Sequence, residues 1–280
     1  MRLSSLMTAI FVCIGAILSP AADKIPIRFS PPLGDKISYS LESLIRSDSA
    51  NLMGNDASIG AFANGDLTIE IERVTANNVY ASLTSSNLTI TLQSAASTRN
   101  INLDTDEGKA LKIVFSRTGK VDEITNLSAL KTQNIMNFSL VQIIRNYFPT
   151  LPSKPVSVGE SWTDNRQMTI PFEGMQLEAL LASKYTLDSL IDTQAGSEAS
   201  ISVDYSVSLK GSKPFGKGSA VFEGKGKGTG YLFYFVSKGY FSEYRLNYEV
   251  DSTIKVKDSS QVLMQVPVRV SANAALRLLK

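Results

Sequence analysis

The sequence contains no histidine, and its single cysteine, Cys13, lies in an apolar run near the N-terminus. Histidine is the commonest general base and metal ligand, and cysteine thiolates supply much of the remaining nucleophile and soft-metal chemistry. Beyond Cys13, the two absences exclude His-dependent catalytic triads, His or Cys zinc sites and disulfides. We therefore expect a protein that is not an enzyme, with no catalytic residues, no metal site and no cofactor.

Long apolar segments are also missing, apart from a short one at the start of the chain. Residues 1–22 resemble an export signal, because Arg2 precedes an apolar run that ends at Leu18, and small residues allow cleavage after Ala21 or Ala22. The run is too short to span a membrane as a helix, which needs about 18 or more apolar residues. We expect an exported protein, periplasmic or secreted, with at most peripheral membrane association. An uncleaved N-terminal anchor is the alternative.

An excess of charge of one sign is absent too. The chain has 28 Lys and Arg against 26 Asp and Glu, a net charge of +2. This balance gives no general field for nucleic acid, so we expect no nucleic-acid partner. Small exported domains often depend on disulfides. A chain of 280 residues can instead rely on its core, since chains of this size bury about 70–75% of their unfolded surface.

What the sequence does contain is alternation of apolar and polar residues with a period of two, which is typical of strands with one buried face. Glycine, asparagine, aspartate and serine separate the alternating segments. We predict a mainly β protein with a twisted antiparallel sheet or an open half-barrel. The segments are centred on Ile37–Leu41, Leu67–Ile71, Val79–Leu83, Leu88–Leu92, Ile201–Val207, Tyr244–Val250 and Val262–Val268.

One segment breaks this pattern. Residues 127–148 carry apolar side chains at helical spacing on more than one side, which predicts one long apolar helix that needs cover on several sides. Pro149 ends it, because a residue before proline is pushed out of the helical region. We expect the helix to lie across the sheet or inside its curve. The domain organisation is then a first β half with the helix at 23–148 and a second β half at 149–280, in one continuous domain.

The two halves resemble each other in short motifs that follow prolines or surround glycines. The set around Gly119 and Gly239 predicts the same hairpin in both halves: a strand that ends at Phe115 or Phe235, a turn with glycine at a position of positive φ, and a return strand. A duplication is one interpretation, and convergence of β-hairpins on similar patterns is the other. The matching sets are Gly34-Asp35-Lys36-Ile37 with Gly159-Glu160-Ser161-Trp162, and Gly108, Phe115, Gly119 and Glu123 with Gly228, Phe235, Gly239 and Glu243.

A run of alternate glycines from Gly224 to Gly230 looks like a phosphate-binding loop. Such a loop must open a helix, whereas Tyr231–Val236 here reads as a strand. In a strand the glycines share one bare face, which allows close packing of another element or contact with a ligand. The lysines around the run suggest either a basic patch for anionic headgroups or solvated lysines on the sheet. They are Lys210, Lys213, Lys217, Lys225, Lys227 and Lys238, against Glu223.

Other catalytic motifs lack their required partners. Residues 159–163 miss the last glycine of a nucleophile elbow, and residues 128–131 match S-x-x-K without its companion motifs. The carboxylates Asp164, Glu173 and Glu178 remain as candidates for glycosidase-type chemistry, which needs two carboxyl groups facing each other.

The segment Pro155-Val-Ser-Val-Gly-Glu-Ser-Trp162 and the glycine-punctuated strands after it resemble uncharacterised exported bacterial β-rich proteins of unknown function. The resemblance covers mainly residues 110–250, and it implies export and a β-rich fold but no activity. At the level of the fold alone, a sheet wrapped around a helix is similar to the half-barrel of periplasmic lipoprotein and lipid carriers.

We therefore expect an exported non-enzymatic protein that binds a lipid or another apolar or amphipathic ligand between sheet and helix. The alternative is a structural or protein-interaction module of the bacterial cell envelope, with an envelope protein as its partner. An outer-membrane barrel is a third hypothesis, and it requires an outward apolar band. The candidate ligand-binding residues are Phe138, Val141, Ile144, Gly226, Gly228, Leu232 and Tyr234.

Overall fold

The computed structural model describes residues 23–49, 57–94, 97–131, 140–172, 175–194, 196–216, 218–258 and 261–279. These residues form one antiparallel sheet of twelve strands, which confirms the mainly β prediction. The strands are β1 Lys36–Ser49, β2 Ala57–Val74, β3 Asn78–Gln93, β4 Thr98–Asn102, β5 Leu111–Ser116, β6 Val121–Thr125, β7 Ser161–Phe172, β8 Met175–Thr193, β9 Gly196–Phe215, β10 Gly218–Phe235, β11 Tyr240–Asp258 and β12 Gln261–Leu278. The helices are η1 Leu127–Ala129 and α1 Leu140–Tyr147.

The strand order follows from two meanders joined at one seam. It runs β6-β5-β3-β2-β1-β12-β11-β10-β9-β8-β7, with β4 paired to β3. Strands next to each other in the chain pair as hairpins, as alternating segments with short turns favour. The seam is the long pairing of β1 with β12, from Tyr39 opposite Leu278 to Ser49 opposite Val268. A single sheet therefore contains strands from both halves of the chain.

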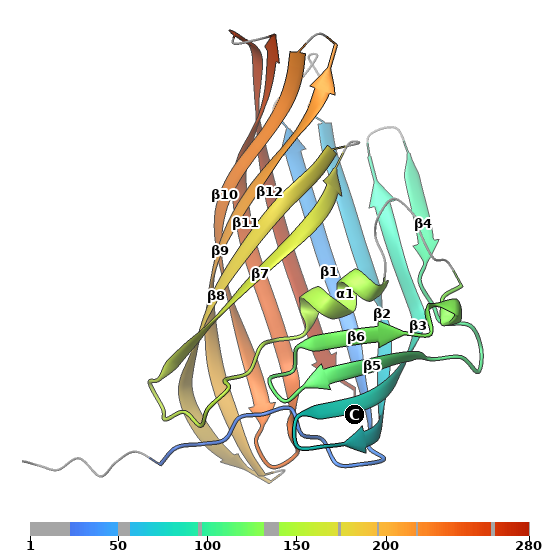
Figure 1. Ribbon diagram of the computed structural model, residues 1–280, viewed down its shortest axis with the longest axis vertical. Helices are drawn as coiled ribbons and strands as arrows, with labels where there is room; N and C mark the ends of the chain where they lie inside the picture. The colour runs from blue at the N-terminus through green and yellow to red at the C-terminus, as the bar shows by residue number, and fades with distance from the viewer. Residues whose placement is uncertain are drawn as a thin grey trace, which may run out of the picture.

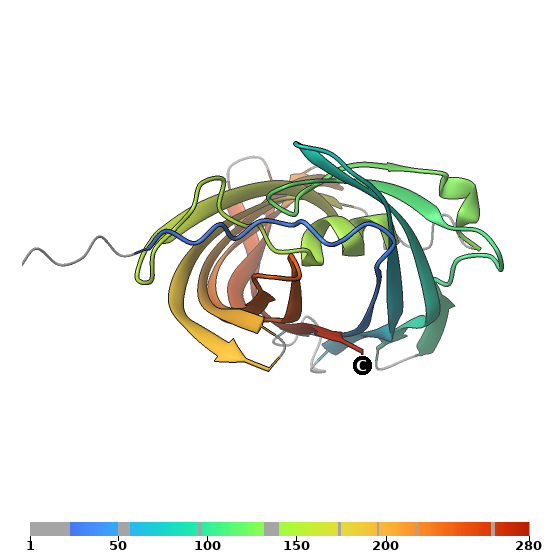
Figure 2. The same cartoon turned by 90° about the horizontal axis from the view of Figure 1, so that it is seen from below.

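The sheet is strongly twisted and curls around α1, which lies inside the curve (Figures 1 and 2). It is open, because β6 and β7 are the two ends of the strand order. The N-terminal segment from residue 23 onward crosses the lower end of the molecule (Figure 2). It is held there by the Phe29 amide, which donates to the Arg117 carbonyl at 2.8 Å, and by the Ser30 amide, which donates to the Gly239 carbonyl at 2.9 Å.

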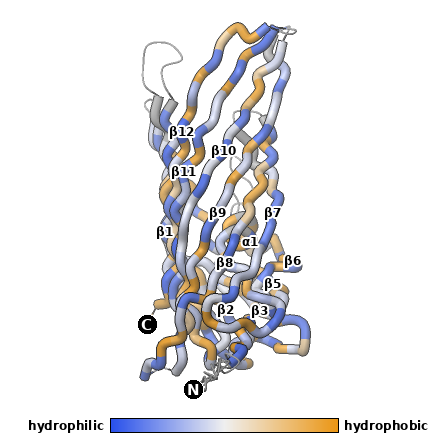
Figure 3. Tube along the Cα trace, turned by 90° about the vertical axis from the view of Figure 1, so that its left-hand side faces the viewer, coloured by the Kyte–Doolittle hydropathy of each residue, from blue (hydrophilic) through white to orange (hydrophobic). Residues whose placement is uncertain are grey.

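Hydropathy alternates along the strands, so that one face of the sheet is apolar (Figure 3). In the lower half this face forms the main core, where α1 and the N-terminal segment cover it. Phe148, directly after α1, packs at ring-centroid distances of 5.3 Å from Phe115 and 5.8 Å from Phe241. It thereby joins the two halves. A second, separate cluster lies on the upper part of strands β8 to β11, formed by Leu177, Ala179, Leu209, Ala220, Phe222 and Val250.

The predicted helix 127–148 is wrong in its length. The structure has a short 3-10 turn at Leu127–Ala129 and the α-helix Leu140–Tyr147. Leu130 is extended, with φ −83° and ψ 125°, and it pairs with Thr105. The backbone from residue 129 to 131 bonds to the segment 104–106 instead of forming a helical turn. The predicted end of the helix before Pro149 is confirmed, and residues 132–139 lie outside the described residues.

The hairpins predicted at Gly119 and Gly239 are confirmed, with φ of 78° and 73° in the β5–β6 and β10–β11 turns. Gly228 lies within β10 and does not match the turn at Gly108.

The motifs at Gly34 and Gly159 also form matching turns. Gly34 and Gly159 have φ of 84° and 87°, and each precedes the first strand of its half. Each turn exchanges two backbone hydrogen bonds with the second strand of its half, β2 or β8. In both strands a β-bulge follows directly after the bonded residue. The bonds are Gly34 N to Ile71 O (2.9 Å) and Ile71 N to Asp35 O (2.9 Å), and Gly159 N to Leu187 O (2.7 Å) and Leu187 N to Glu160 O (3.0 Å).

Candidate functional site

A groove with a volume of about 1010 Å³ crosses β7 to β12. We call it the outer groove, because its side chains come mainly from the face of the sheet opposite the core. Two rows of mostly exposed residues form its walls, and a row of alternate residues between them forms its floor. The walls contain Thr163, Asn165, Ala182, Lys184, Asp204, Ser206, Lys227, Thr229, Asn247, Glu249, Ser271 and Asn273, and the floor Ser183, Tyr205, Gly228 and Tyr248.

The groove is polar and nearly neutral. Its walls carry two lysines and two carboxylates, and strand register sets Lys184 opposite Asp204 and Lys227 opposite Glu249. The remaining wall residues, apart from one alanine, are amides and hydroxyls. The floor tyrosines, Tyr205 and Tyr248, pack against the buried clusters on the inner face of the sheet. No wall residue is aromatic. The groove can therefore donate and accept many hydrogen bonds, but it offers no apolar platform.

The alternate glycines of β10 allow this strand to lie close to β11 at the floor of the outer groove. A Cβ on Gly226 would lie 2.2 Å from the carbonyl oxygen of Glu249, and one on Gly228 would lie 2.3 Å from that of Asn247. Real Cβ atoms do not approach a backbone oxygen this closely, so β10 lies against β11 in a way that only glycine permits. The bare face of the run is used by the neighbouring strand.

The structure separates the residues predicted to bind a ligand. Ile144 of α1 and Leu232 and Tyr234 of β10 are completely buried in the main core, and Val141 is half-buried against it. Gly226 and Gly228 lie higher on β10, with Gly228 in the outer groove. Phe138 lies outside the described residues. The space between α1 and the lower sheet is thus filled by core side chains, including a 2.7 Å hydrogen bond between the Tyr147 and Ser43 hydroxyls.

A buried ionic cluster joins the two ends of the open sheet. Asp164 of β7 has a side chain that is only 2% exposed, and its Oδ1 lies 2.6 Å from Lys120 Nζ in the β5–β6 turn. Its Oδ2 accepts hydrogen bonds from Thr150 Oγ1 at 2.6 Å and from Arg166 Nε at 2.8 Å. We call these four residues the closure cluster. Sequence reasoning considered Asp164 as one of a carboxylate pair, whereas its partners are cations and a hydroxyl.

Arg166 extends the closure cluster to the end of α1. Its guanidinium donates to the carbonyls of Phe148 at 2.7 Å and Arg145 at 3.2 Å, and to Thr150 Oγ1 at 2.8 Å. A cation at the C-terminus of a helix satisfies carbonyls that have no partner within the helix. Trp162 Nε1 also donates to the Thr150 carbonyl, at 2.8 Å, and its ring stacks on Tyr185 at 5.4 Å.

Burial acts on the ionisable groups of the interior. Burial alone would raise the pKa of Asp164, but hydrogen bonds from Lys120, Thr150 and Arg166 outweigh it and hold that pKa below its usual value. Burial raises the pKa of Tyr205 and Tyr244, whose hydroxyls lie 2.6 Å apart. These tyrosines therefore stay neutral at physiological pH, which is consistent with a structural role.

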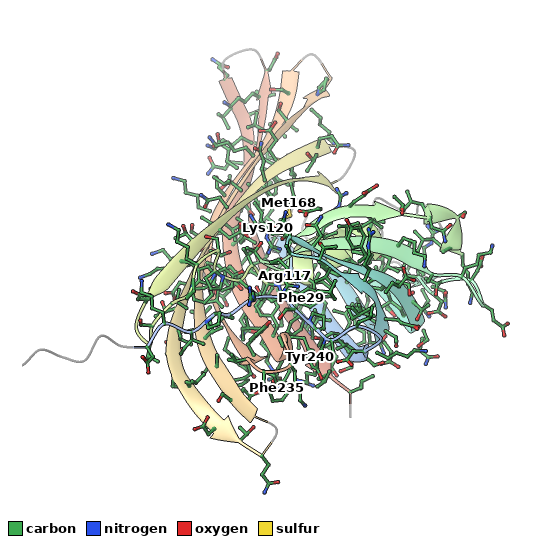
Figure 4. All side chains as sticks on the ribbon, turned by 60° about the horizontal axis from the view of Figure 1, so that its bottom comes forward. Phe29, Arg117, Lys120, Met168, Phe235 and Tyr240 are labelled. Atoms are coloured by element: carbon green, nitrogen blue, oxygen red, sulfur yellow. The ribbon has the colours of Figure 1, made fainter. Side chains whose placement is uncertain are left out.

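Arg117 is the exception among the buried polar groups. Within the described part of the chain, its Nε and Nη1 are buried without a hydrogen-bond partner. Burial first, and then the nearby Arg28, lower the pKa of Arg117. It lies beside Phe29 and near Lys120, where the N-terminal segment crosses the molecule (Figure 4).

The described residues contain no group of three or more Asp, Glu, His or Cys side chains placed to hold a metal ion. Among the same residues, no helix is long and apolar enough to cross a membrane. The carboxylates considered for catalysis do not form a described pair, because Asp164 is buried in the closure cluster, Glu178 is exposed on β8 and Glu173 lies outside the described residues.

Comparisons with known proteins give no family. No family model matches the chain, and no curated protein does. Among solved structures, it is similar to OccK2 (OpdF) of Pseudomonas aeruginosa in complex with glucuronate, at 8% identity and a TM-score of 0.23, over 90% of this chain and 100% of that one. It is also similar to OccK5 (OpdH) of the same organism, at 9% identity and a TM-score of 0.20, over 90% and 100% of the chains. TM-scores this low support no conclusion about fold, location or function.

Proposed function

We propose that the chain is an exported, non-enzymatic binding protein and that it holds a polar, uncharged, hydroxyl-rich ligand, such as an oligosaccharide, in the outer groove. The observation that carries this proposal is the wall of the groove, where amides, hydroxyls and opposed charge pairs line a volume of about 1010 Å³. Hydroxyl-rich ligands need many donors and acceptors, and the equal numbers of lysines and carboxylates in the walls give a charged ligand no net attraction.

The composition of the groove argues against other occupants. Protein interfaces are enriched in aromatic residues, Met and Arg, and depleted in Lys, Asp, Glu and Ser, whereas the walls show the opposite bias. Pockets for apolar small molecules are lined mainly by hydrophobic side chains, which the walls also lack. The hydroxyl groups of a saccharide both donate and accept hydrogen bonds, so they match the amides and hydroxyls of the groove walls best.

Calorimetric titration of the mature protein with neutral oligosaccharides tests the proposal. We expect saturable binding that the double variant Asn247→Ala, Asn273→Ala weakens by about tenfold or more, since each lost hydrogen bond contributes about 1 kcal/mol. Thr253→Ala, on the same face of β11 but outside the groove, is the matched control and should bind normally. Equal binding by both variants, or no binding to any neutral glycan, would refute a polar site here.

Export is proposed from residues 1–22 alone. Cell fractionation and the N-terminal sequence of the mature protein test it. A mature N-terminus at Ala22 or Asp23 supports cleavage, and recovery of the full chain with the cytoplasm contradicts export.

A second proposal places an apolar or amphipathic ligand, such as a lipid, on the inner face above α1. It is favoured by the second cluster, where Met168, Val207, Ile254 and Val270 are only partly buried on strands that extend beyond α1 (Figure 1). Native mass spectrometry of protein purified from the envelope should then reveal bound lipid. Co-purifying proteins instead of lipid would favour the alternative of an envelope interaction module.

A further inference from the structure

Two hairpins end together at the upper end of the molecule (Figure 1). Register aligns their ends, since Ser219 of β10 lies opposite Pro214 of β9 and Lys257 of β11, and Lys257 lies opposite Val262 of β12. We call this end the hairpin tip and define it by residues 210–216, 218–223, 253–258 and 261–266. It lies beyond the outer groove and outside the sites proposed above.

The hairpin tip exposes three consecutive apolar residues. Val262 is 50% exposed, Leu263 is 64% exposed and Met264 is 39% exposed. The register between β11 and β12 shifts at this point, because Val256 pairs with Met264 and Lys257 with Val262, which leaves Leu263 as a bulged residue without a partner. A run of three exposed apolar residues is unfavourable in water unless it serves a contact.

Lysines lie on the strands of the tip beside this apolar run, with Lys257 directly opposite Val262. Lys255 Nζ lies 3.0 Å from Glu223 Oε2 on the neighbouring strand, and Lys210 and Lys257 are near enough to act electrostatically on the same carboxylate. The Glu223 carboxylate therefore has three lysines in its surroundings. The described residues of the tip contain two acidic residues, Glu223 and Asp258, and four lysines, Lys210, Lys213, Lys255 and Lys257.

We infer that the hairpin tip docks on an anionic phospholipid surface. Leu263 and its two apolar neighbours enter the boundary between headgroups and acyl chains, while the lysines contact phosphate groups and keep their ammonium groups in water. A second copy of the chain is disfavoured as the occupant, because two tips meeting face to face would bring like charges together. The association is peripheral, as three side chains and a few lysines hold a protein reversibly.

The opposite end of the molecule provides a matched comparison. The β8–β9 hairpin exposes Leu190 at 39% and Ile191 at 50%, but its charged neighbours are acidic. It therefore offers similar apolar exposure with acidic instead of basic residues in the hairpin, and we expect that it does not bind anionic lipid. The acidic residues near it are Asp188, Asp192 and Glu198.

Flotation of the mature protein with vesicles tests the inference, using phosphatidylcholine with and without phosphatidylglycerol. We expect binding only with phosphatidylglycerol, weakened by salt. Lys255→Gln, Lys257→Gln should weaken binding about fivefold per lysine, and Val262→Ser, Leu263→Ser should weaken it at least tenfold. The control Leu190→Ser, Ile191→Ser should bind normally, and circular dichroism should confirm that each variant is folded.

Three outcomes would overturn the inference. They are equal binding to both vesicle types, equal loss in the control and tip variants, and a concentration-dependent dimer that the tip substitutions abolish. Because the readout is vesicle binding, a failure here is independent of oligosaccharide binding in the outer groove.

Discussion

At the scale of single residues, Asp164 is a buried carboxylate with three polar partners. Its carboxylate is buried among Lys120, Thr150 and Arg166, which connect β7, the β5–β6 turn and the end of α1. An ion pair of this kind is costly to bury, but breaking it by removing one partner leaves an uncompensated charge. The cluster therefore fixes the arrangement of these elements.

Asp164→Asn should lower the free energy of unfolding by about 3 kcal/mol, because the Arg166 guanidinium would stay buried without its counter-ion. Urea denaturation measures this loss, and Asp122→Asn, an exposed carboxylate on β6, should change it by less than about 0.5 kcal/mol. Since the pKa of Asp164 is depressed in the folded state, its contribution is complete above the usual aspartate pKa. It is lost as the pH falls through the folded value, so the two proteins should converge in acid.

Arg117 leads to the opposite prediction. Its Nε and Nη1 are buried without partners in the described structure, which costs desolvation energy with no hydrogen bond in return. Arg117→Met keeps the aliphatic stem and removes the charge next to Arg28. We expect it to raise the free energy of unfolding by about 1 kcal/mol, measured as a higher denaturation midpoint. A clear decrease would mean that the guanidinium has a stabilising partner.

At the scale of elements, β10 depends on its glycines. They let β10 approach β11 closely in the middle of a strand 18 residues long, from Gly218 to Phe235, while its ends carry large side chains. The alternation of glycine with lysine predicted the strand and its bare face. It did not predict what occupies that face, because this depends on the strand packed beside it.

Gly228→Ala should destabilise the protein by about 1–3 kcal/mol or more, since the new Cβ would lie 2.3 Å from the carbonyl oxygen of Asn247 and the backbone would have to move. Gly60→Ala is the matched control, because Gly60 also lies in a strand but no heavy atom lies closer than 4.0 Å to its Cβ position. The control should be neutral or slightly stabilising in thermal denaturation. Equal destabilisation by both would show that close packing is not the cause.

The helix illustrates where element prediction failed. Apolar spacing is equally good across residues 127–148, yet only Leu140–Tyr147 forms an α-helix in the described structure. Asn126 has a left-handed φ of 58°, and Leu130 pairs with Thr105. Those long-range backbone hydrogen bonds replace helical ones, and local periodicity contains no information about them.

At the scale of the whole molecule, the sheet encloses a mainly aliphatic core that also contains several buried tyrosines. Burial raises the pKa of Tyr39, Tyr205 and Tyr244, because a phenolate loses its hydration in the interior. The connector after α1 and the closure cluster complete the enclosure between β6 and β7. The stability of the fold thus depends on keeping these tyrosines neutral.

The thermal midpoint should therefore fall steeply above about pH 10, where tyrosines ionise in the unfolded chain but not in the folded one. A group with a raised folded pKa contributes fully below its unfolded value and loses that contribution as the pH rises. Calorimetry between pH 8 and 11 measures the change. Tyr244→Phe should flatten the decrease, because it removes one of the buried hydroxyls whose pKa is raised.

Alternation determined that this is a mainly β protein, since period-two burial is a local property of a strand. The sequence also indicated the hairpin turns at Gly119 and Gly239, because a position of positive φ favours glycine. Only the tertiary structure decided that β1 pairs with β12, that Asp164 meets Lys120 and Arg166, and that polar residues of β7 to β12 form one groove. The pairing, the buried ion pairs and the groove each bring together residues that are far apart in the chain. They arise from the curl of the whole sheet, and the sequence of any one segment contains no information about that curl.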